Sequence, residues 1–414
     1  MPTHPPSLDD TSRRGTSLRH DTSLLHDTSL LHDTVRPLRV GMVSTYPPKL
    51  CGLATFAAAL SGALRDAGHR VDVMRLDDGD EPIGIGQRVA GELVNGSPAS
   101  LRSAAVVLSR CDAVIVQHEY GIFGGPDGDE VLTLLDAVSS PAIVVLHTVP
   151  LVPTPHQREV LEEVCRRAAC IVVMTASAND RLRSSYAVDH TKVEVIPHGA
   201  AIPERTLAAG AVTSTPATPQ LLTWGLLGPG KGIEHVIDAM ALLADVRPAL
   251  HYTVAGVTHP KVFARVGDAY RNSLMRRAAT NGVAGRVHFD DSYRNVAQLT
   301  RFVASATLVV LPYDSRDQVT SGVLVDAIAA GRPVIATAFP HALELVDSGA
   351  VRVVPHDDPP ALAAAIRSVM QPDVLAEMTA AAGRLAPTMS WAAVGERYLA
   401  VCADLLQVNE PVAI

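Results

Sequence analysis

From Leu38 onward the chain alternates short apolar runs with segments whose apolar residues recur at helical spacing. Short apolar runs predict strands that are buried on both faces of a parallel sheet. Helices are predicted at 54–68, where Phe56, Leu60, Ala63 and Leu64 share one face, and at 156–169. In the first half the predicted strands cover residues 38–45, 71–76, 112–117, 142–147, 170–175 and 193–197. This alternation favours an α/β domain.

The same alternation restarts after residues 204–219, a stretch rich in Ala, Thr, Pro and Gly that we interpret as a linker. The fold class is therefore predicted as α/β, with two Rossmann-like domains whose parallel sheets face a central cleft. Predicted strands lie at 220–227, 251–256, 286–290, 307–313 and 333–337, and predicted helices at 233–245 and before Gly331. The predicted domains are 36–203 and 220–388, and residues 389–414 are expected to form a helix and tail across the domain junction.

Residues 1–35 carry a six-residue repeat that places His20, His26 and His32 at equal intervals. Spaced histidines can bind metal, but a period of six matches neither a helix nor a strand. We favour a disordered, low-complexity tail.

Composition narrows the classes of function. The net charge of −8 gives no electrostatic reason to bind nucleic acid, and it does not support peripheral contact with an anionic membrane. Five cysteines without CxxC spacing argue against a disulfide framework and a zinc site, and fit a reducing compartment. No apolar run reaches the roughly 18 residues of a membrane span, and the N-terminus lacks an apolar signal core, so we expect a cytoplasmic protein.

A glycine-rich loop with one lysine opens the second domain. Gly225, Gly230 and Lys231 match the first part of a phosphate-binding loop, between a predicted strand and a predicted helix. Gly232 stands where a nucleotide hydrolase has the Ser or Thr that holds Mg²⁺. Backbone amides, a helix N-terminus and a lysine still suit a phosphate, whereas a plain glycine turn with a surface lysine is the alternative.

A second candidate segment covers residues 317–337. Thr320 or Ser321 can cap a helix whose first amides, at Ser321, Gly322 and Val323, suit a diphosphate. Asp326 follows one turn later and can accept hydrogen bonds from ribose hydroxyls. A carboxylate in an apolar helix is costly unless it is paired or exposed, which favours a binding role over an ordinary solvent-facing Asp.

These segments resemble the donor-binding half of retaining GT-B glycosyltransferases of family 4. Lys231-Gly232, the acidic helix and AAGRPVIAT carry the resemblance in the second half. In the first half STYPPKLCGLATF, with Gly52, resembles the family's first loop, and VQHEYGIFGG, VVLHT and VIPHG resemble its cleft-facing strand ends. The resemblance covers roughly Leu38 to Leu406. It implies a hexosyltransferase-type enzyme that uses a nucleotide-sugar donor and a carbohydrate or other hydroxyl acceptor.

Two positions depart from the family pattern. The family's Glu-x7-Glu pair corresponds to Gln318 and Asp326, so one donor-sugar carboxylate is an amide here. Leu226 stands where the family has an arginine, which removes a bidentate phosphate contact. Gln318 can still hydrogen-bond sugar hydroxyls, so we retain the enzymatic interpretation.

Polar residues also end the predicted strands of the first domain. The resemblance implies that His118 contacts the donor sugar and assists transfer, beside Glu119 as a possible acid/base or electrostatic group. His147 is as readily structural as functional, and His198 fits a domain-ending turn with a possible cleft contact. With Lys231 and the helix dipole against the phosphates, no metal or other cofactor is expected. We interpret the acidic run at 77–80 as a solvated turn rather than a metal motif.

Three alternatives remain open. A nucleotide-sugar epimerase or a sugar phosphorylase can use the same architecture, and Gln318 with Leu226 also fits a catalytically altered or silent sugar-nucleotide-binding protein. An NAD(P)-dependent dehydrogenase is disfavoured, because no G-x-G-x-x-G follows the first predicted strand.

Overall fold

The computed structural model describes residues 36–49, 51–77, 89–203, 218–292 and 294–408. The predicted tail at 1–35, residues 78–80 of the acidic run and residues 204–217 of the predicted linker lie outside the described residues. All the elements below lie in the compact unit Leu38–Ile414.

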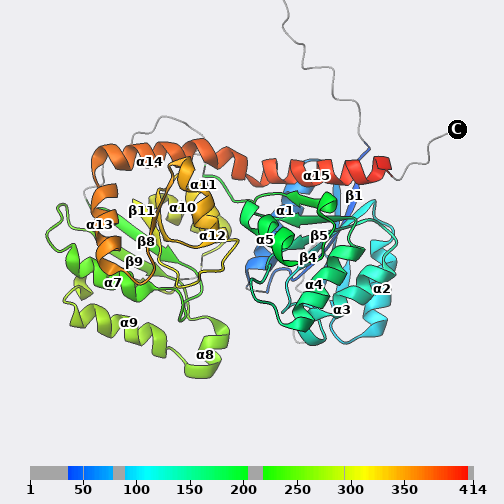
Figure 1. Cartoon of the computed structure of the whole chain (residues 1–414), viewed down its shortest axis with the longest axis horizontal. Helices are drawn as coiled ribbons and strands as arrows, with labels where there is room; N and C mark the ends of the chain where they lie inside the picture. The colour runs from blue at the N-terminus through cyan, green and yellow to red at the C-terminus, as the bar shows by residue number, and fades with distance from the viewer. Residues whose placement is uncertain (1–35, 50, 78–88, 204–217, 293, 409–414) are drawn as a thin grey trace, which may run out of the picture. The chain divides into compact units, whose positions relative to one another are not determined.

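The first sheet has seven parallel strands in the order β3-β2-β1-β4-β5-β6-β7 (Figure 1). The strands are β1 (Arg39–Ser44), β2 (Arg70–Asp77), β3 (Gly91–Val94), β4 (Ala113–His118), β5 (Ala142–Leu146), β6 (Cys170–Val173) and β7 (Val193–Val195). The connecting helices are α1 (Gly52–Asp66), α2 (Pro98–Leu108), α3 (Glu130–Ala137), α4 (Pro155–Arg167) and α5 (Ala176–Ser185). Every pair of neighbouring strands is parallel, as continuous apolar runs predict.

The second sheet has six parallel strands in the order β10-β9-β8-β11-β12-β13. Its strands are β8 (Gln220–Trp224), β9 (His251–Ala255), β10 (Val287–Asp290), β11 (Leu308–Leu311), β12 (Val334–Thr337) and β13 (Val351–Val354). Its helices are α7 (Ile233–Leu242), α8 (Pro260–Val266), α9 (Ala269–Thr280), α10 (Val296–Ser305), α11 (Gly322–Ala329), α12 (Pro340–Glu344), α13 (Pro359–Val369) and α14 (Pro372–Leu385). The α/β class with two Rossmann-like sheets is therefore confirmed.

Each sheet is buried on both faces. In the first sheet Met42 packs with Phe56 and Leu60 of α1, whereas Val43 packs in a second core with residues of α2, α3 and α4. Residues i and i+1 of a strand point to opposite faces, so both must be apolar when helices cover both faces.

The last helix, α15 (Trp391–Val408), returns to the first sheet. The backbone crosses at Ala200, whose N–H donates to Met389 O (2.7 Å) and whose carbonyl accepts from Trp391 N (3.3 Å). Arg397 then donates to Val195 O at 2.6 Å. Figure 1 shows α15 alongside α1. The residues after the second sheet thus complete a helical layer of the first domain.

Several elements lack a clear sequence signal. In β3 one residue of four, Leu93, is buried, and α8 buries none of its side chains. An element that buries so little has little reason to show a hydrophobic period.

Candidate active site between the two sheets

A cavity of about 380 Å³ lies where residues from both Rossmann-like sheets meet. The two domains contribute opposite walls. Residues 52–59, His147, His198, Gly199, Ala201 and Trp391 form one wall, and residues of α10 and of the start of α11 form the other. Of the sequence-predicted site residues, the cavity brings together Gly52, His147, His198, Gly322, Val323 and Asp326. This is the expected position, outside the carboxyl ends of the strands.

The start of α1 leaves open space on the first wall. Cys51 caps the helix, because its Sγ accepts from Ala54 N at 3.4 Å. A side chain at Gly52 would meet nothing within 4 Å. A ligand can therefore approach the backbone of the first turn.

The imidazole of His147 lies in an aromatic group on this wall. Its Nε2 lies 2.6 Å from Gln117 Oε1, and its ring packs edge-on against Phe56 at 5.0 Å. Burial, with smaller contributions from neighbouring imidazoles, lowers the pKa of His147 to about 3. His147 is therefore neutral at physiological pH and, with Oε1 as its partner, donates from Nε2.

His118 and Glu119 lie at the end of β4, outside the residues that line the cavity. His118 is fully buried, burial lowers its pKa to about 4, and neither ring nitrogen has a hydrogen-bond partner among the described residues. Its ring packs edge-on against Tyr120. Glu119 accepts from the Thr148 hydroxyl. The expectation that His118 shares one site with the second-domain residues is therefore not met by the cavity as it stands.

His198 and Gly322 bring the two domains close together. A methyl group on Gly322 would lie 2.9 Å from His198 Nε2, so the glycine permits this approach. His198 Nδ1 lies 2.7 Å from Gly199 O, and burial lowers the His198 pKa to about 4. Besides offering a backbone amide, Gly322 therefore leaves room for the histidine across the cleft.

The helix cap at Ser321 is as predicted, but its backbone amide is already engaged. Ser321 Oγ accepts from Leu324 N at 3.3 Å, which makes it the N-cap of α11. Ser321 N–H donates to His341 Nδ1 at 2.9 Å. The expected set of three phosphate-binding amides therefore reduces to Gly322 and Val323. His341, whose pKa burial lowers to about 4, was not predicted as a site residue.

Asp326 lines the cavity with its carboxylate unengaged. Among the described residues none donates a hydrogen bond or offers an ion pair to it, and burial raises its pKa to about 7. An uncompensated carboxyl group of this kind is typical of a functional site. Beside it, the buried Thr320 hydroxyl also lacks a partner.

The glycine-rich loop lies close to the end of β11. A Cβ on Gly232 would sit 1.7 Å from Pro312 O, and φ is +62°, so only glycine fits there. Lys231 does not line the cavity. Its Nζ lies 4.5 Å from the Tyr313 ring centre, burial lowers its pKa, and no carboxylate of the described residues pairs with it. The ammonium group therefore has no protein carboxylate as a counter-ion among the described residues.

Gln318 also lies outside the cavity lining. Its side-chain Nε2 donates to Thr320 O at 3.1 Å, within its own loop. Its main-chain carbonyl accepts from the backbone N–H of His341 at 3.4 Å. Leu226, at the position of the family's arginine, is 37% exposed.

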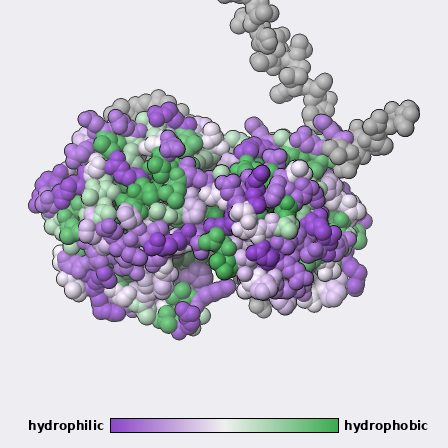
Figure 2. All heavy atoms as spheres, viewed as in Figure 1, coloured by the Kyte–Doolittle hydropathy of each residue, from purple (hydrophilic) through white to green (hydrophobic). Residues whose placement is uncertain are grey.

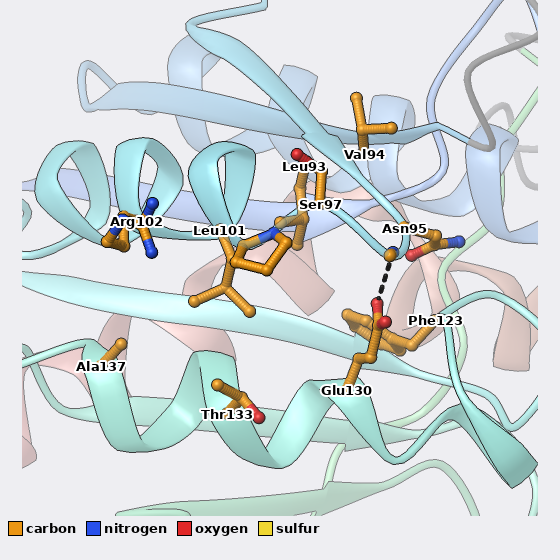
Figure 3. A pocket seen from close by; sticks show the side chains of 12 residues that line it. Leu93, Val94, Asn95, Ser97, Leu101, Arg102, Phe123, Glu130, Thr133 and Ala137 are labelled. Atoms are coloured by element: carbon orange, nitrogen blue, oxygen red, sulfur yellow. Dashed lines mark hydrogen bonds between the residues drawn. The ribbon is translucent and has the colours of Figure 1, made fainter.

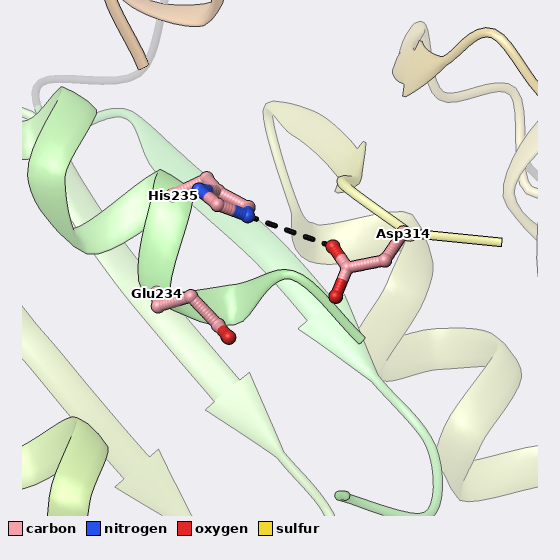
Figure 4. Close-up of side chains that lie close together, drawn as sticks. All are labelled: Glu234, His235 and Asp314. Atoms are coloured by element: carbon pink, nitrogen blue, oxygen red, sulfur yellow. Dashed lines mark ion pairs between the residues drawn. The ribbon is translucent and has the colours of Figure 1, made fainter. Parts of the chain in front are cut away.

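One group in the described part of the chain has metal-ligand types close together. Glu234, His235 and Asp314 each offer an atom within 4.8 Å of the others (Figure 4). His235 Nε2 already lies 3.1 Å from Asp357 and 3.5 Å from Asp314, and Glu234 accepts from Tyr270 OH at 2.8 Å. These contacts hold the three side chains without an ion.

A separate pocket of about 340 Å³ lies in the first domain between α2 and α3 (Figure 3). Leu93, Leu101 and Phe123 line its apolar part, and Glu130 accepts from Gly96 N at 2.9 Å across it. None of the sequence-predicted site residues lines it.

Sequence reasoning missed the wall formed by α10. Val296, Leu299 and Thr300 line the cavity there, and Trp391 closes it from the last helix. The signal for α10 is a capping box, in which Asn295 and Gln298 bond each other's backbone amides.

Comparisons with known proteins agree with this geometry. Residues 51–202 match the family described as Glycosyltransferase Family 4, and residues 218–372 match Glycosyl transferases group 1. Together these two matches cover about three quarters of the chain. No curated protein has a significant sequence match.

Solved structures with the same fold include three of similar extent. A glycosyltransferase from Rickettsia africae is 14% identical with a TM-score of 0.69, and the match covers 91% of this chain and 100% of the other. HepE from Anabaena, in complex with UDP, is 16% identical with a TM-score of 0.70, and the match covers 89% of this chain and 100% of the other. Sucrose-phosphate synthase from Thermosynechococcus elongatus is 18% identical with a TM-score of 0.68, and the match covers 90% of this chain and 100% of the other.

Proposed function

We propose that this chain, whose two domains are glycosyltransferase domains in a GT-B fold, transfers a sugar from a nucleoside-diphosphate sugar to an acceptor hydroxyl. The observation that carries the proposal is the cavity, which combines an unengaged carboxylate, free helix amides and open backbone at Gly52. HepE, of similar fold, has been crystallised with UDP and with UDP-glucose. We infer a donor of the same chemical class here.

The donor nucleotide occupies the second-domain wall in this proposal. Asp326 accepts hydrogen bonds from the ribose hydroxyls, because its oxygens have no protein donor among the described residues. The apolar side chains of Val296 and Leu299 offer a surface for the base. The N–H groups of Gly322 and Val323, at the positive end of α11, then face the diphosphate.

Sugar transfer builds negative charge on the departing diphosphate while the sugar becomes oxocarbenium-like. The α11 amides and the Lys231 ammonium group stabilise that charge, an electrostatic contribution on the order of several kcal/mol. Lys231 is suited to this role because it is partly desolvated and has no competing carboxylate among the described residues. We assign retention of the anomeric configuration on the family resemblance.

The first domain presents the acceptor. His118 has two free ring nitrogens at the end of β4, and Glu119 and His147 lie at the same sheet edge. His118 is neutral because of its lowered pKa, so one nitrogen donates and the other accepts. In this proposal His118 hydrogen-bonds the transferred sugar, as the family resemblance implies, once donor binding opens the end of β4, because the side chain is fully buried in the ligand-free structure.

We further propose that transfer needs no metal. The phosphate charge is met by Lys231 and α11, and the three candidate ligands Glu234, His235 and Asp314 are engaged with protein partners. Activity that persists in EDTA supports this. Loss of activity in EDTA, restored by a divalent cation, contradicts it and directs attention to these three residues.

Thermal-shift screening of UDP-, GDP- and ADP-sugars in EDTA tests the donor. We expect one nucleotide class to raise Tm in the wild type, and Asp326→Ala and Lys231→Ala to reduce that shift. Glu377→Ala, an exposed change on α14, serves as the control. An unchanged shift in both site variants would place the donor elsewhere. NMR of the product, showing retention or inversion at the anomeric carbon, then tests the stereochemistry.

A silent sugar-nucleotide-binding protein is a second candidate because Gln318 and Leu226 replace two charged residues of the family pattern. Calorimetry separates the two functions. Donor binding without transfer or hydrolysis across a panel of acceptors supports the silent protein. Release of free nucleotide supports the enzyme.

A further inference from the structure

Helix α8 in the second domain is exposed on nearly every side. None of its residues is buried, and its helical face shows Phe263 at 55% and Val266 at 50% exposure. Two further apolar side chains in the adjoining segments, Val257 and Met275, are each 48% exposed. Figure 2 shows green atoms among purple ones at the lower tip of the molecule, where Figure 1 places α8. This degree of apolar exposure on one short segment marks it as a contact surface.

The charge of the same segment runs against that of the whole chain. Residues 257–277 contain five Lys and Arg against one Asp, whereas the whole chain has a net charge of −8. Arg277 pairs with Asp238, and Arg271 donates to Gly256 O. The net charge of the whole chain, which gives no support for membrane contact, therefore hides a local excess of positive charge.

Arg277 is the one of these five cations that pairs with a carboxylate among the described residues, and Lys261, Arg265 and Arg276 have neither a carboxylate nor a backbone carbonyl as partner there. Lys261 and Arg265 are one helical turn apart on one face of α8, and Phe263 and Val266 lie on the opposite face. The acidic residue of the segment, Asp268, accepts from the Thr258 hydroxyl. An exposed helix with an apolar face and a basic polar face suits a lipid surface, where the apolar groups enter the headgroup boundary and the long cationic side chains reach the phosphates.

We propose that α8 and the adjoining segments dock this protein on an anionic lipid bilayer. Charge complementarity favours an anionic bilayer as the binding partner. The bilayer attracts the basic segment 257–277, and it repels the rest of the chain, which is negatively charged. None of the described helices is long and apolar enough to cross a membrane, so the docking is peripheral.

Docking at α8 also places the glycine-rich loop near the bilayer. Leu227 N donates to Val257 O (2.9 Å), His259 N donates to Leu227 O (2.8 Å), and Val262 lies against Gly228. An acceptor attached to a lipid would then meet the cleft without leaving the membrane. This consequence, unlike the docking itself, rests on the proposed transferase function.

Co-sedimentation of the full-length chain with vesicles tests the proposal. We expect binding to vesicles of equal phosphatidylcholine and phosphatidylglycerol, weakened by salt, and little binding to phosphatidylcholine alone. Each basic residue near an anionic surface contributes roughly fivefold, so K261E/R265E should weaken binding by more than about twentyfold. F263S/V266S should weaken vesicle binding at low and at high salt concentration, because the loss of apolar contact does not depend on screening. All four positions are exposed, so these variants should fold like the wild type.

The controls in the first domain are R102E/R110E, with Arg102 on α2 and Arg110 just after it, and V106S on α2, where Val106 is 54% exposed. Equal loss in the α2 and α8 variants, or no vesicle binding by the wild type, overturns the proposal. So does sedimentation velocity showing a dimer that F263S/V266S dissociates, because the surface would then join two copies. Since vesicle binding is measured without substrates, its failure is distinct from a failure of sugar transfer.

Discussion

At the scale of single residues, the fold shifts the pKa of Asp326 into the physiological range, and Asp326 lines the candidate site. Its folded-state pKa of about 7 is above the ordinary value, because burial penalises the charged form. This group's contribution to stability is therefore fully present below about pH 4 and is lost as the pH rises through 7. Water reaching the cavity limits the size of the effect.

We predict that Asp326→Asn stabilises the ligand-free protein relative to the wild type by about 1–2 kcal/mol at pH 8 and by much less at pH 5. Urea unfolding at both pH values measures the difference. The same variant should bind the donor about tenfold more weakly, because ionised oxygens accept stronger hydrogen bonds. A pH-independent stability difference would mean that Asp326 is paired in solution.

Gly322 sets the distance between the two walls of the site. We predict that Gly322→Ala keeps the fold but lowers donor affinity or turnover at least about tenfold, because the methyl group displaces His198 in the cavity. Isothermal titration and initial rates measure this. Gly62→Ala in α1 is the control. Nothing lies within 4 Å of that position, and replacing a helix-interior glycine should stabilise by about 0.5–1 kcal/mol. Equal activity of both variants would remove Gly322 from the site.

At the scale of elements, α5 and α12 connect the two domains. The Glu344 carboxylate on α12 accepts from Ala176 N (3.0 Å) and Ser177 N (2.6 Å), the first amides of α5. Arg181 of α5 donates to Asp317 O at 3.1 Å, in the loop that leads to α11. A carboxylate at a helix N-terminus gains both hydrogen bonds and a favourable dipole. These contacts join α5 of the first domain to α12 and to the loop before α11 in the second domain.

We predict that Glu344→Ala loosens the closure of the domains and raises hydrolysis of the bound donor relative to transfer about two- to fivefold, since a less closed cleft admits water. Hydrogen exchange should increase in α5 and in residues 314–321. The control is Glu377→Ala on α14, an exposed glutamate. If the hydrolysis-to-transfer ratio and the exchange rates stay at wild-type values, the contact does not govern closure.

At the scale of the whole molecule, four imidazoles lie in the cleft region, of which His118 and His341 are buried and His147 and His198 are half-buried. Burial lowers the pKa of His118, His198 and His341 to about 4 and that of His147 to about 3. The unfolded chain, with ordinary histidines near pH 6.5, binds more protons between pH 4 and 6.5. The stability from these groups is therefore present above pH 6.5 and lost as the pH falls towards 4. Asp326 acts in the opposite direction, but it is one group against four.

We predict a steep fall of the unfolding free energy between pH 6.5 and 4.5, on the order of several kcal/mol in total. Denaturant titrations across this range measure it. Replacing His341 by Gln should make the fall shallower, because one titrating group is removed. Replacing the exposed His288 of β10 is the matched change and should leave the slope intact. A flat profile would show that water reaches these imidazoles in solution.

The sequence by itself determined the two α/β domains and the chemistry at their strand ends. Apolar runs and the residues that cap helices are local, so Ser321, Gly232 and the strands of both sheets other than β3 and β13 could be identified without coordinates. The tertiary structure alone decided which groups meet, since a side chain's direction depends on contacts distant in sequence. In the folded chain Ser321 N–H donates to His341, and the Gln318 side chain donates to a carbonyl of its own loop. Residues of α10 and Trp391 form part of the cavity wall. These pairings join residues far apart along the chain, where a hydrophobic period carries no information.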